Sequence, residues 1–331
     1  MASKVVYVMT RGRVTTTYLV KSDSGKYFSI NTNNRTESLK VDDIVSSTER
    51  LKPVKDYWIR AYEQSLLYPS EKMRAHLIEY KETVLKSHHI VIKGDNSYHH
   101  ILPTPEDNLI LGYSYDEALL STIELLRKKN ELREDFTHLN SSQAFAVNFF
   151  APLNAENKLG LLGENIVSTD DVKCDFEVVE DKQEKTQFDF LGKRSDGTIA
   201  FSVEVKYSEE CFGPAEENTK HIKKYPLHYE KWMHELASVD EKEYAFFEYY
   251  QIWRNLIYTV RNPGQHICFF FPDFRKDLKE AVEFIQKKCK EEYWPYIHIV
   301  TADEIINRII PLGGNIGQYY TEFKKKYLDI D

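Results

Sequence analysis

Residues 186–206 read TQFDFLGKRSDGTIAFSVEVK, and their alternating pattern predicts two short strands joined by a turn. Asp196 and Gly197 form a strong hairpin signal, because a two-residue type I′ turn requires positive φ at both central positions. If these two residues are the whole loop, the register places Asp189 directly opposite Glu204. The position of the turn therefore predicts which side chains of the two strands meet.

Strand alternation separates an aromatic face of this hairpin from a charged one. Phe188 and Phe190 point to one side of their strand, so Asp189 points to the other side, together with Glu204 and Lys206. Opposed Cβ atoms in such a pair lie about 4.5–5.5 Å apart. Two carboxylates that face each other repel unless a cation or a proton lies between them. The hairpin therefore predicts a metal site.

This hairpin resembles the catalytic core of the PD-(D/E)XK nuclease superfamily, in which an Asp and an E-x-K on adjacent strands hold a divalent ion. Asp189 matches the first acid and residues 204–206 match E-x-K, whereas Phe188 replaces the Pro of the motif. The segments LNSSQAF, VNFFAPL and YYQIWRN are similar to bacterial restriction-endonuclease-like proteins of that superfamily, over about residues 138–310. A solvated hairpin face with a Glu–Lys pair is the alternative, but the nearly continuous apolar strands are typical of a buried sheet.

The resemblance implies a Mg²⁺ site in which Mn²⁺ can substitute. Asp189 and Glu204 would supply carboxylate ligands, and Val205 would supply its backbone carbonyl. Mg²⁺ prefers such oxygen ligands, and it lowers the pKa of a bound water. Lys206 would orient or help to deprotonate the attacking water. Burial would lower the pKa of Lys206 and the carboxylates would raise it, and the sequence leaves that balance open.

Other side chains are further candidates for the same site. Glu164 stands where the superfamily often places an acid on the helix before the sheet, and Gln251 matches a glutamine that related nucleases present towards the cleft. Asn255 lies one helical turn after Gln251 and shares its face. Gln143 belongs to the resemblance without an assigned role. A solvated charge or a hydrogen-bonded amide is the alternative for each.

Composition indicates an ordinary cytoplasmic protein. The chain has 331 residues, a net charge of −8 and four cysteines without a C-x-x-C pair, which argues against a zinc ribbon or a disulfide framework. No apolar run reaches membrane length, and the first residues lack a signal-peptide core. We therefore expect a reducing compartment and no membrane.

The first 60 residues differ in charge from the rest of the chain. They hold eleven Lys or Arg against six Asp or Glu, a net of +5, which leaves −13 for the remainder. Residues 1–50 contain short alternating segments separated by turns, and we expect a small β-barrel that binds substrate. Its candidate nucleic-acid contacts are Arg11, Arg13, Lys21, Lys26 and Arg35.

The remaining patterns predict an α/β fold. Residues 51–137 read as a mostly helical connector with a hairpin, residues 138–312 as the nuclease core and residues 313–331 as a C-terminal helical tail. In the core, helices alternate with the hairpin and with two later strands. This order predicts a restriction-endonuclease-like mixed sheet flanked by helices.

The sequence therefore predicts a metal-dependent endonuclease that acts on double-stranded DNA, in restriction or in defence against foreign DNA. A non-catalytic nucleic-acid-binding protein that keeps the fold is the alternative, and a repair nuclease or an RNA-directed nuclease is another. Cleavage of both strands usually needs two active sites, so a homodimer is an arrangement that the sequence leaves open.

Overall fold

The protein consists of two compact units. The computed structural model describes residues 3–11, 15–32, 44–45, 52–54, 59, 70–93, 96–163, 165–166, 172–181, 186–215 and 219–330. The units are Met1–Pro69 and Ser70–Asp331. The predicted boundaries at residues 50, 137 and 312 stay predictions.

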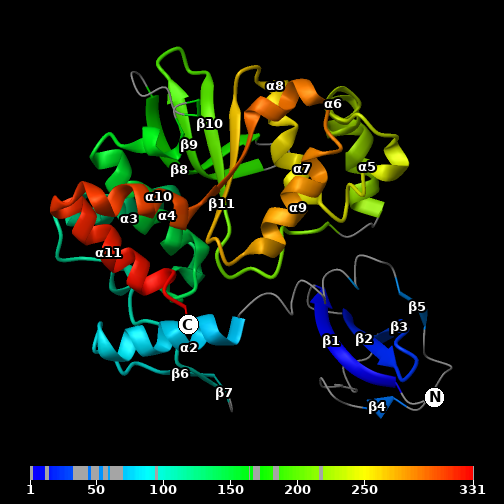
Figure 1. The fold of residues 1–331 in the computed structure, drawn as a ribbon, viewed down its shortest axis with the longest axis horizontal. Coiled ribbons are helices and arrows are strands. Elements are labelled where there is room, and N and C mark those ends of the chain that lie inside the picture. The colour runs from blue at the N-terminus through cyan, green and yellow to red at the C-terminus, as the bar shows by residue number, and fades with distance from the viewer. Residues whose placement is uncertain are drawn as a thin grey trace. The chain divides into compact units, whose positions relative to one another are not determined.

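The first unit is built around one antiparallel sheet with the strand order β4-β1-β2-β3-β5 (Figure 1). Its strands are β1 (Ser3–Arg11), β2 (Thr15–Ser22), β3 (Tyr27–Thr32), β4 (Ile44–Val45) and β5 (Lys52–Pro53). Val5, Tyr18, Val20 and Ile30 form its buried core. The predicted closed barrel is wrong, because β4 and β5 lie at opposite edges and no pairing among the described residues closes the sheet.

The second unit contains a five-stranded mixed sheet in the order β12-β11-β10-β9-β8. Its strands are β8 (Val172–Asp181), β9 (Thr186–Arg194), β10 (Ile199–Val205), β11 (His266–Phe271) and β12 (Ile297–Thr301). Strands β8, β9 and β10 are antiparallel, whereas β10, β11 and β12 are parallel. The predicted mixed sheet is confirmed, although sequence analysis missed β8.

Helices cover both faces of this sheet (Figure 1). On one side lie α3 (Asp116–Lys129), α4 (Ser142–Ala155), α10 (Ala302–Ile309) and α11 (Gly314–Tyr327). On the other side lie α5 (Thr219–His228), α6 (Glu230–Leu236), α7 (Tyr250–Leu256), α8 (Tyr258–Arg261) and α9 (Lys276–Gln286). Before them come α2 (Ser70–Thr83) and a short hairpin of β6 (Val91–Lys93) and β7 (Asn96–Tyr98), and 3₁₀ turns connect several elements, among them η2 (Glu106–Asn108), η3 (Glu134–Thr137) and η6 (Glu241–Glu243).

Helix α4 lies in the middle of the first helical layer. Its side chains from Gln143 to Leu153 are all buried, as expected of a helix that is apolar on every side. Ser141 caps its N-terminus by accepting a hydrogen bond from the N–H of Ala144. Phe150 stacks on Phe190 of β9, with the ring centroids 4.7 Å apart. The helix therefore fixes the aromatic face of the sheet.

The opposite face of the sheet is covered by a second apolar cluster. Trp253 of α7 is fully buried there with Phe269 of β11 and Met233 of α6. The indole N–H of Trp253 donates to the carbonyl of Tyr244 at 2.8 Å, so its one polar atom is satisfied. This cluster positions α7, which faces the end of β10.

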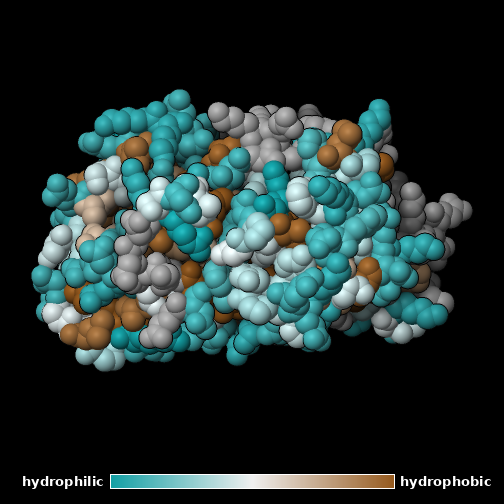
Figure 2. All heavy atoms as spheres, turned by 90° about the horizontal axis from the view of Figure 1, so that it is seen from above, coloured by the Kyte–Doolittle hydropathy of each residue, from teal (hydrophilic) through white to brown (hydrophobic). Residues whose placement is uncertain are grey.

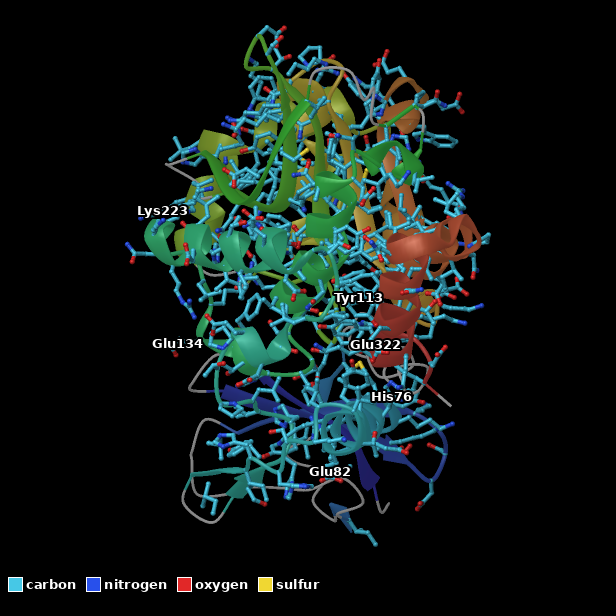
Figure 3. The ribbon with its side chains drawn as sticks, turned by 90° about the vertical axis from the view of Figure 1, so that its left-hand side faces the viewer. His76, Glu82, Tyr113, Glu134, Lys223 and Glu322 are labelled. Carbon is cyan, nitrogen blue, oxygen red and sulfur yellow. The ribbon has the colours of Figure 1, made fainter. Side chains whose placement is uncertain are left out.

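The C-terminal helix α11 is part of the core. Its Tyr319, Tyr320 and Phe323 are fully buried. Helix α2 packs on it: His76 contacts the carbonyl of Lys325 at 2.9 Å, and Tyr80 donates to Glu322 at 2.7 Å. Figure 3 shows the labelled His76 and Glu322 at this contact.

A buried lysine joins α11 to η2. The Nζ of Lys326 donates to the carbonyl oxygen of Asn108 at 2.6 Å and to its Oδ1 at 2.9 Å. Asn108 in turn donates to the carbonyls of Phe136 and His138, each at 2.7 Å. Burial lowers the pKa of Lys326 to about 7, although Glu322 acts against this shift.

Much of the molecular surface is polar. On the face in Figure 2, hydrophilic residues predominate and the hydrophobic ones occur in separate groups. Within the described ranges, no helix is both long and apolar enough to cross a membrane.

Lys326 gives the fold a predicted pH dependence. Its pKa is lower in the folded protein than the ordinary lysine value, so between pH 7 and pH 9 the unfolded chain binds a proton that the folded chain does not. Stability should therefore rise with pH in this window, with a contribution of at most about 1.4 kcal/mol per pH unit from this group. When Lys326→Met is unfolded with urea at several pH values, its free energy of unfolding should rise less steeply with pH than that of wild type, by that amount. The exposed Lys325→Met is the control, and an equal slope in Lys326→Met and wild type would contradict the assignment.

Candidate active site

The loop between β9 and β10 differs from the predicted turn. The N–H of Arg194 donates to the carbonyl of Thr198 at 2.8 Å, and the N–H of Gly197 donates to the carbonyl of Arg194 at 2.9 Å. Gly197 has φ +85°. This pattern is a three-residue loop, a type I turn followed by a left-handed glycine, so the predicted two-residue type I′ turn is wrong.

The predicted pairing at the far end of the hairpin nevertheless agrees with the structure. An irregularity in β10 next to the loop shifts the register back by one residue, so that Val203 pairs with Phe190. The next step places Glu204 opposite Asp189. Oδ2 of Asp189 accepts a hydrogen bond from the N–H of Val205 at 2.7 Å, which fixes this carboxylate beside the end of β10.

The alternation of side chains breaks at Asp189. Phe188 packs on α8, whereas Phe190 stacks on α4, so these two rings do not share a face as predicted. The neighbouring strand β8 is irregular at the same level, because Glu177, which lies opposite Asp189, has φ +51°. A positive φ is uncommon outside glycine and costs free energy, so the surrounding contacts must hold this backbone.

Glu204 is enclosed by three donors. Its Oε1 accepts hydrogen bonds from Nζ of Lys206 at 2.8 Å and from Nε2 of Gln251, and its Oε2 accepts one from Nδ2 of Asn255 at 2.8 Å. Gln251 is itself oriented by the N–H of Gly213, which donates to its Oε1 at 2.9 Å. Glu204 is only 2% exposed, so these donors meet the requirement of a buried carboxylate for partners.

On the other side of Asp189 lies a second buried acid. Nη2 of Arg133 is 3.1 Å from Oδ1 of Asp189 and 3.1 Å from Oε2 of Glu177. Gln143 of α4 donates to Oε1 of Glu177 at 2.7 Å and to the carbonyl of Glu131 at 2.9 Å, and its Oε1 accepts from the N–H of Arg133 at 2.9 Å. Gln143 therefore holds both the acid and the backbone of its arginine partner.

Burial and neighbouring charges shift the pKa values of two members of this cluster upward. Burial, together with the carboxylates of Glu204 and Glu177, raises the pKa of Asp189 to about 8, although Arg133 and Lys206 act in the opposite direction. Burial alone would lower the pKa of Lys206, but its carboxylate neighbours, Glu204 first, raise it above the ordinary lysine value. The balance that the sequence leaves open is therefore decided by the carboxylates, and Lys206 carries a proton.

The donor set suits a hard divalent ion. Asp189 and Glu204 offer carboxylate oxygens on neighbouring strands, and Val205, between Glu204 and Lys206, offers a backbone carbonyl. Mg²⁺ takes one or two carboxylates and keeps several of its waters. Oδ1 of Asn255 is buried and accepts no hydrogen bond from the described residues, so an acceptor beside Glu204 is left for an ion-bound water.

The predicted basic contacts belong to the first unit. Lys21 and Lys26 are exposed there. Arg13 and Arg35 lie outside the described residues, and for Arg11 the structure describes the backbone alone. Their role in nucleic-acid binding stays a prediction.

Sequence analysis missed two members of the site, Arg133 and Glu177, and left Gln143 without a role. Glu177 could have been found from the alternation of Cys174, Phe176 and Val178 around it, which signals a third strand beside Asp189. Arg133 lies between α3 and η3. Nothing in its local sequence pattern indicates a contact with Glu177 or Asp189, which follow it by 44 and 56 residues. Glu164 falls outside the described residues.

Gln143 should be essential to the stability of the site. Gln143→Leu removes its three hydrogen bonds and leaves Glu177 with Arg133 as its remaining side-chain partner, so we expect a loss of about 2–4 kcal/mol in the free energy of unfolding. Gln187→Leu is the matched control, because Gln187 donates to the less buried Glu131 and, at 3.5 Å, to the backbone carbonyl of Glu177 but not to its carboxylate, so its loss should cost below about 1 kcal/mol. Chemical denaturation of the metal-free variants measures both values, and equal losses would contradict this role for Gln143.

Comparison with known proteins places this site in a family context. No curated protein and no solved structure matches the chain. One family model matches residues 72–328, which include all five strands of the mixed sheet. The match also includes the acid cluster, which consists of Glu177, Asp189, Glu204 and Glu209 with the bases Arg133 and Lys206. Its description is "Restriction Endonuclease associating with ARP". Because the match covers well over half of the sequence, the chain belongs to this restriction-endonuclease family.

Proposed function

We propose that the protein is a metal-dependent endonuclease that hydrolyses phosphodiester bonds in double-stranded DNA, in restriction or in defence against foreign DNA. One observation carries the proposal: Asp189 accepts a hydrogen bond from the N–H of Val205, the residue after the buried Glu204, and Lys206 donates to Glu204. A solvated hairpin face would not enclose these side chains. Membership of a restriction-endonuclease family supports the same reading.

Asp189, Glu204 and the carbonyl of Val205 are the groups that would hold the ion. A bound Mg²⁺, or Mn²⁺ in its place, supplies Lewis-acid stabilisation of the phosphoryl oxygen and lowers the pKa of the attacking water. Gln251 and Asn255 hold the Glu204 carboxylate in one orientation before substrate arrives. Such preorganisation avoids a reorganisation cost during the reaction.

Lys206 acts as a hydrogen-bond donor in this proposal. Its Nζ is 2.8 Å from Glu204 and 3.9 Å from Glu209, and these acids keep it protonated. A protonated amine donates to a water or to a phosphate oxygen, where it stabilises negative charge that develops in the transition state. Donation from Nζ to the attacking water or to a phosphate oxygen is the role that we assign to Lys206.

The charge of the first unit and the family description bear on the substrate and the partners. The first 60 residues hold eleven Lys or Arg against six Asp or Glu, and Lys21 and Lys26 are exposed there, which suits a contact with phosphates. Cleavage of both DNA strands favours a homodimer. The family description also names ARP, and we extend an association with ARP to this chain as part of the proposal.

Substitution of Lys206 separates cleavage from binding. Lys206→Ala should lower the rate of DNA cleavage by at least about 100-fold, the usual effect of losing one donor to the transition state, and should leave Mg²⁺-dependent DNA binding within a few-fold of wild type. Asp189→Ala should lose both, because it removes a ligand. Cleavage and binding of the same duplex are measured with Mg²⁺ and with EDTA.

Lys193→Ala is the matched control for this experiment. Lys193 lies on the same hairpin, is 40% exposed and pairs with Glu180, so its loss should leave cleavage unchanged. Wild-type protein that binds the duplex but cuts nothing with any divalent ion would leave the non-catalytic alternative as the better account.

A further inference from the structure

The guanidinium of Arg133 occupies the space between two acids on neighbouring strands. Its Nη2 is 3.1 Å from both Asp189 and Glu177, so a single nitrogen bridges the two carboxylates. The other guanidinium nitrogens, Nη1 and Nε, donate to no residue in the described part of the chain. The side chain of Arg133, just before η3, is 41% exposed. The arginine therefore reaches from solvent into the acid cluster.

Glu177, the acid that anchors Arg133, has a backbone conformation that costs free energy. Glu177 is 4% exposed and has φ +51°, and Gln143 supplies its second hydrogen bond at 2.7 Å. An ionised carboxylate that is buried without a cation is strongly destabilising, so Glu177 needs a positive charge beside it to stay ionised. Arg133 is the cation that the described residues provide.

The acids of the cluster outnumber its bases, which gives a formal excess of negative charge. Four acids take part, namely Glu177, Asp189, Glu204 and Glu209, and two bases, Arg133 and Lys206. Four negative charges against two positive ones leave −2 when all six groups are ionised. One divalent ion neutralises this charge, whereas a second would leave an excess of +2 in a largely buried place, which is unfavourable.

The positions of the acids also bear on how many divalent ions the cluster can bind. Among the described residues, one group of three His, Cys, Asp or Glu side chains brings its ligand atoms within 4.8 Å of one another, and it consists of Glu230, His234 and Glu241. Glu177, Asp189 and Glu204 do not form such a group, so one ion cannot readily take an oxygen from all three. The acids on the Glu177 side therefore need a counter-charge of their own.

We propose that Arg133 is the built-in second cation of this site, so that the centre takes one divalent ion, between Asp189 and Glu204, and no second ion between Asp189 and Glu177. The inference rests on the proposed function only in assigning the ion to Asp189 and Glu204. It makes Arg133 a positioning residue for Asp189, because it fixes Oδ1 while Val205 fixes Oδ2.

Counting bound ions tests the proposal without DNA. Mn²⁺ is titrated into the full chain, and bound ions are counted by electron paramagnetic resonance and by calorimetry. All measurements use a His234→Ala background, so that the exposed group at Glu230 and Glu241 does not add a site. The parent protein should bind one Mn²⁺. Arg133→Ala should bind a second one, because it leaves Asp189 and Glu177 facing each other with a formal cluster charge of −3.

Two further variants keep the test decisive if Arg133→Ala does not fold. Arg133→Lys retains a cation and should bind one ion. Arg133→Ala combined with Glu177→Gln removes the unpaired acid and should also return the count to one in a folded protein. Two ions bound by the parent protein, or one ion bound by a folded Arg133→Ala, would overturn the proposal. Because no cleavage is measured, a protein that fails to cut DNA would contradict the nuclease proposal and leave the ion count unaffected.

Discussion

The structure of the second unit depends on burying several carboxylates at the end of one hairpin. Buried charges are tolerated only with partners, and here Arg133, Lys206, Gln143, Gln251 and Asn255 supply them. These partners come from four places: the segment after α3, α4, the end of β10 and α7. The need to satisfy the acids therefore fixes how the helices of both layers meet the sheet. A divalent ion would neutralise the excess negative charge that remains.

The same constraint shapes a second part of the first helical layer. Lys326 of α11, Asn108 of η2 and Asn148 of α4 form a buried polar network, in which Asn148 donates to Asn108 at 3.0 Å and to Tyr327 at 3.1 Å. The network ties the C-terminal helix to α4. Because α4 also holds Glu177 through Gln143, the helix that packs the aromatic core also supports the acid cluster. Helix α4 therefore contributes both to the packing of the aromatic core and to the arrangement of the site.

The mixed sheet could be predicted from the order of helical and strand segments, and the register of the hairpin at Val203 and Phe190 is the predicted one. The loop at Gly197 has one residue more than predicted, and the irregularity in β10 restores the predicted register. Continued by one residue, this register places Glu204 opposite Asp189, although the turn type was predicted wrongly. Glu177 was missed because its strand was not recognised. Arg133 depends on contacts between distant segments, which local patterns do not encode. The predicted barrel failed because short alternating segments do not determine whether a sheet closes.

The central claim is that the hairpin holds a divalent ion at Asp189 and Glu204. An anomalous difference map from crystals of the full chain grown with Mn²⁺ tests it most directly. The account predicts one peak at the site, about 2.1 Å from a carboxylate oxygen of each acid and from the carbonyl of Val205. No peak at Asp189, with Mn²⁺ found only at Glu230, His234 and Glu241, would contradict it.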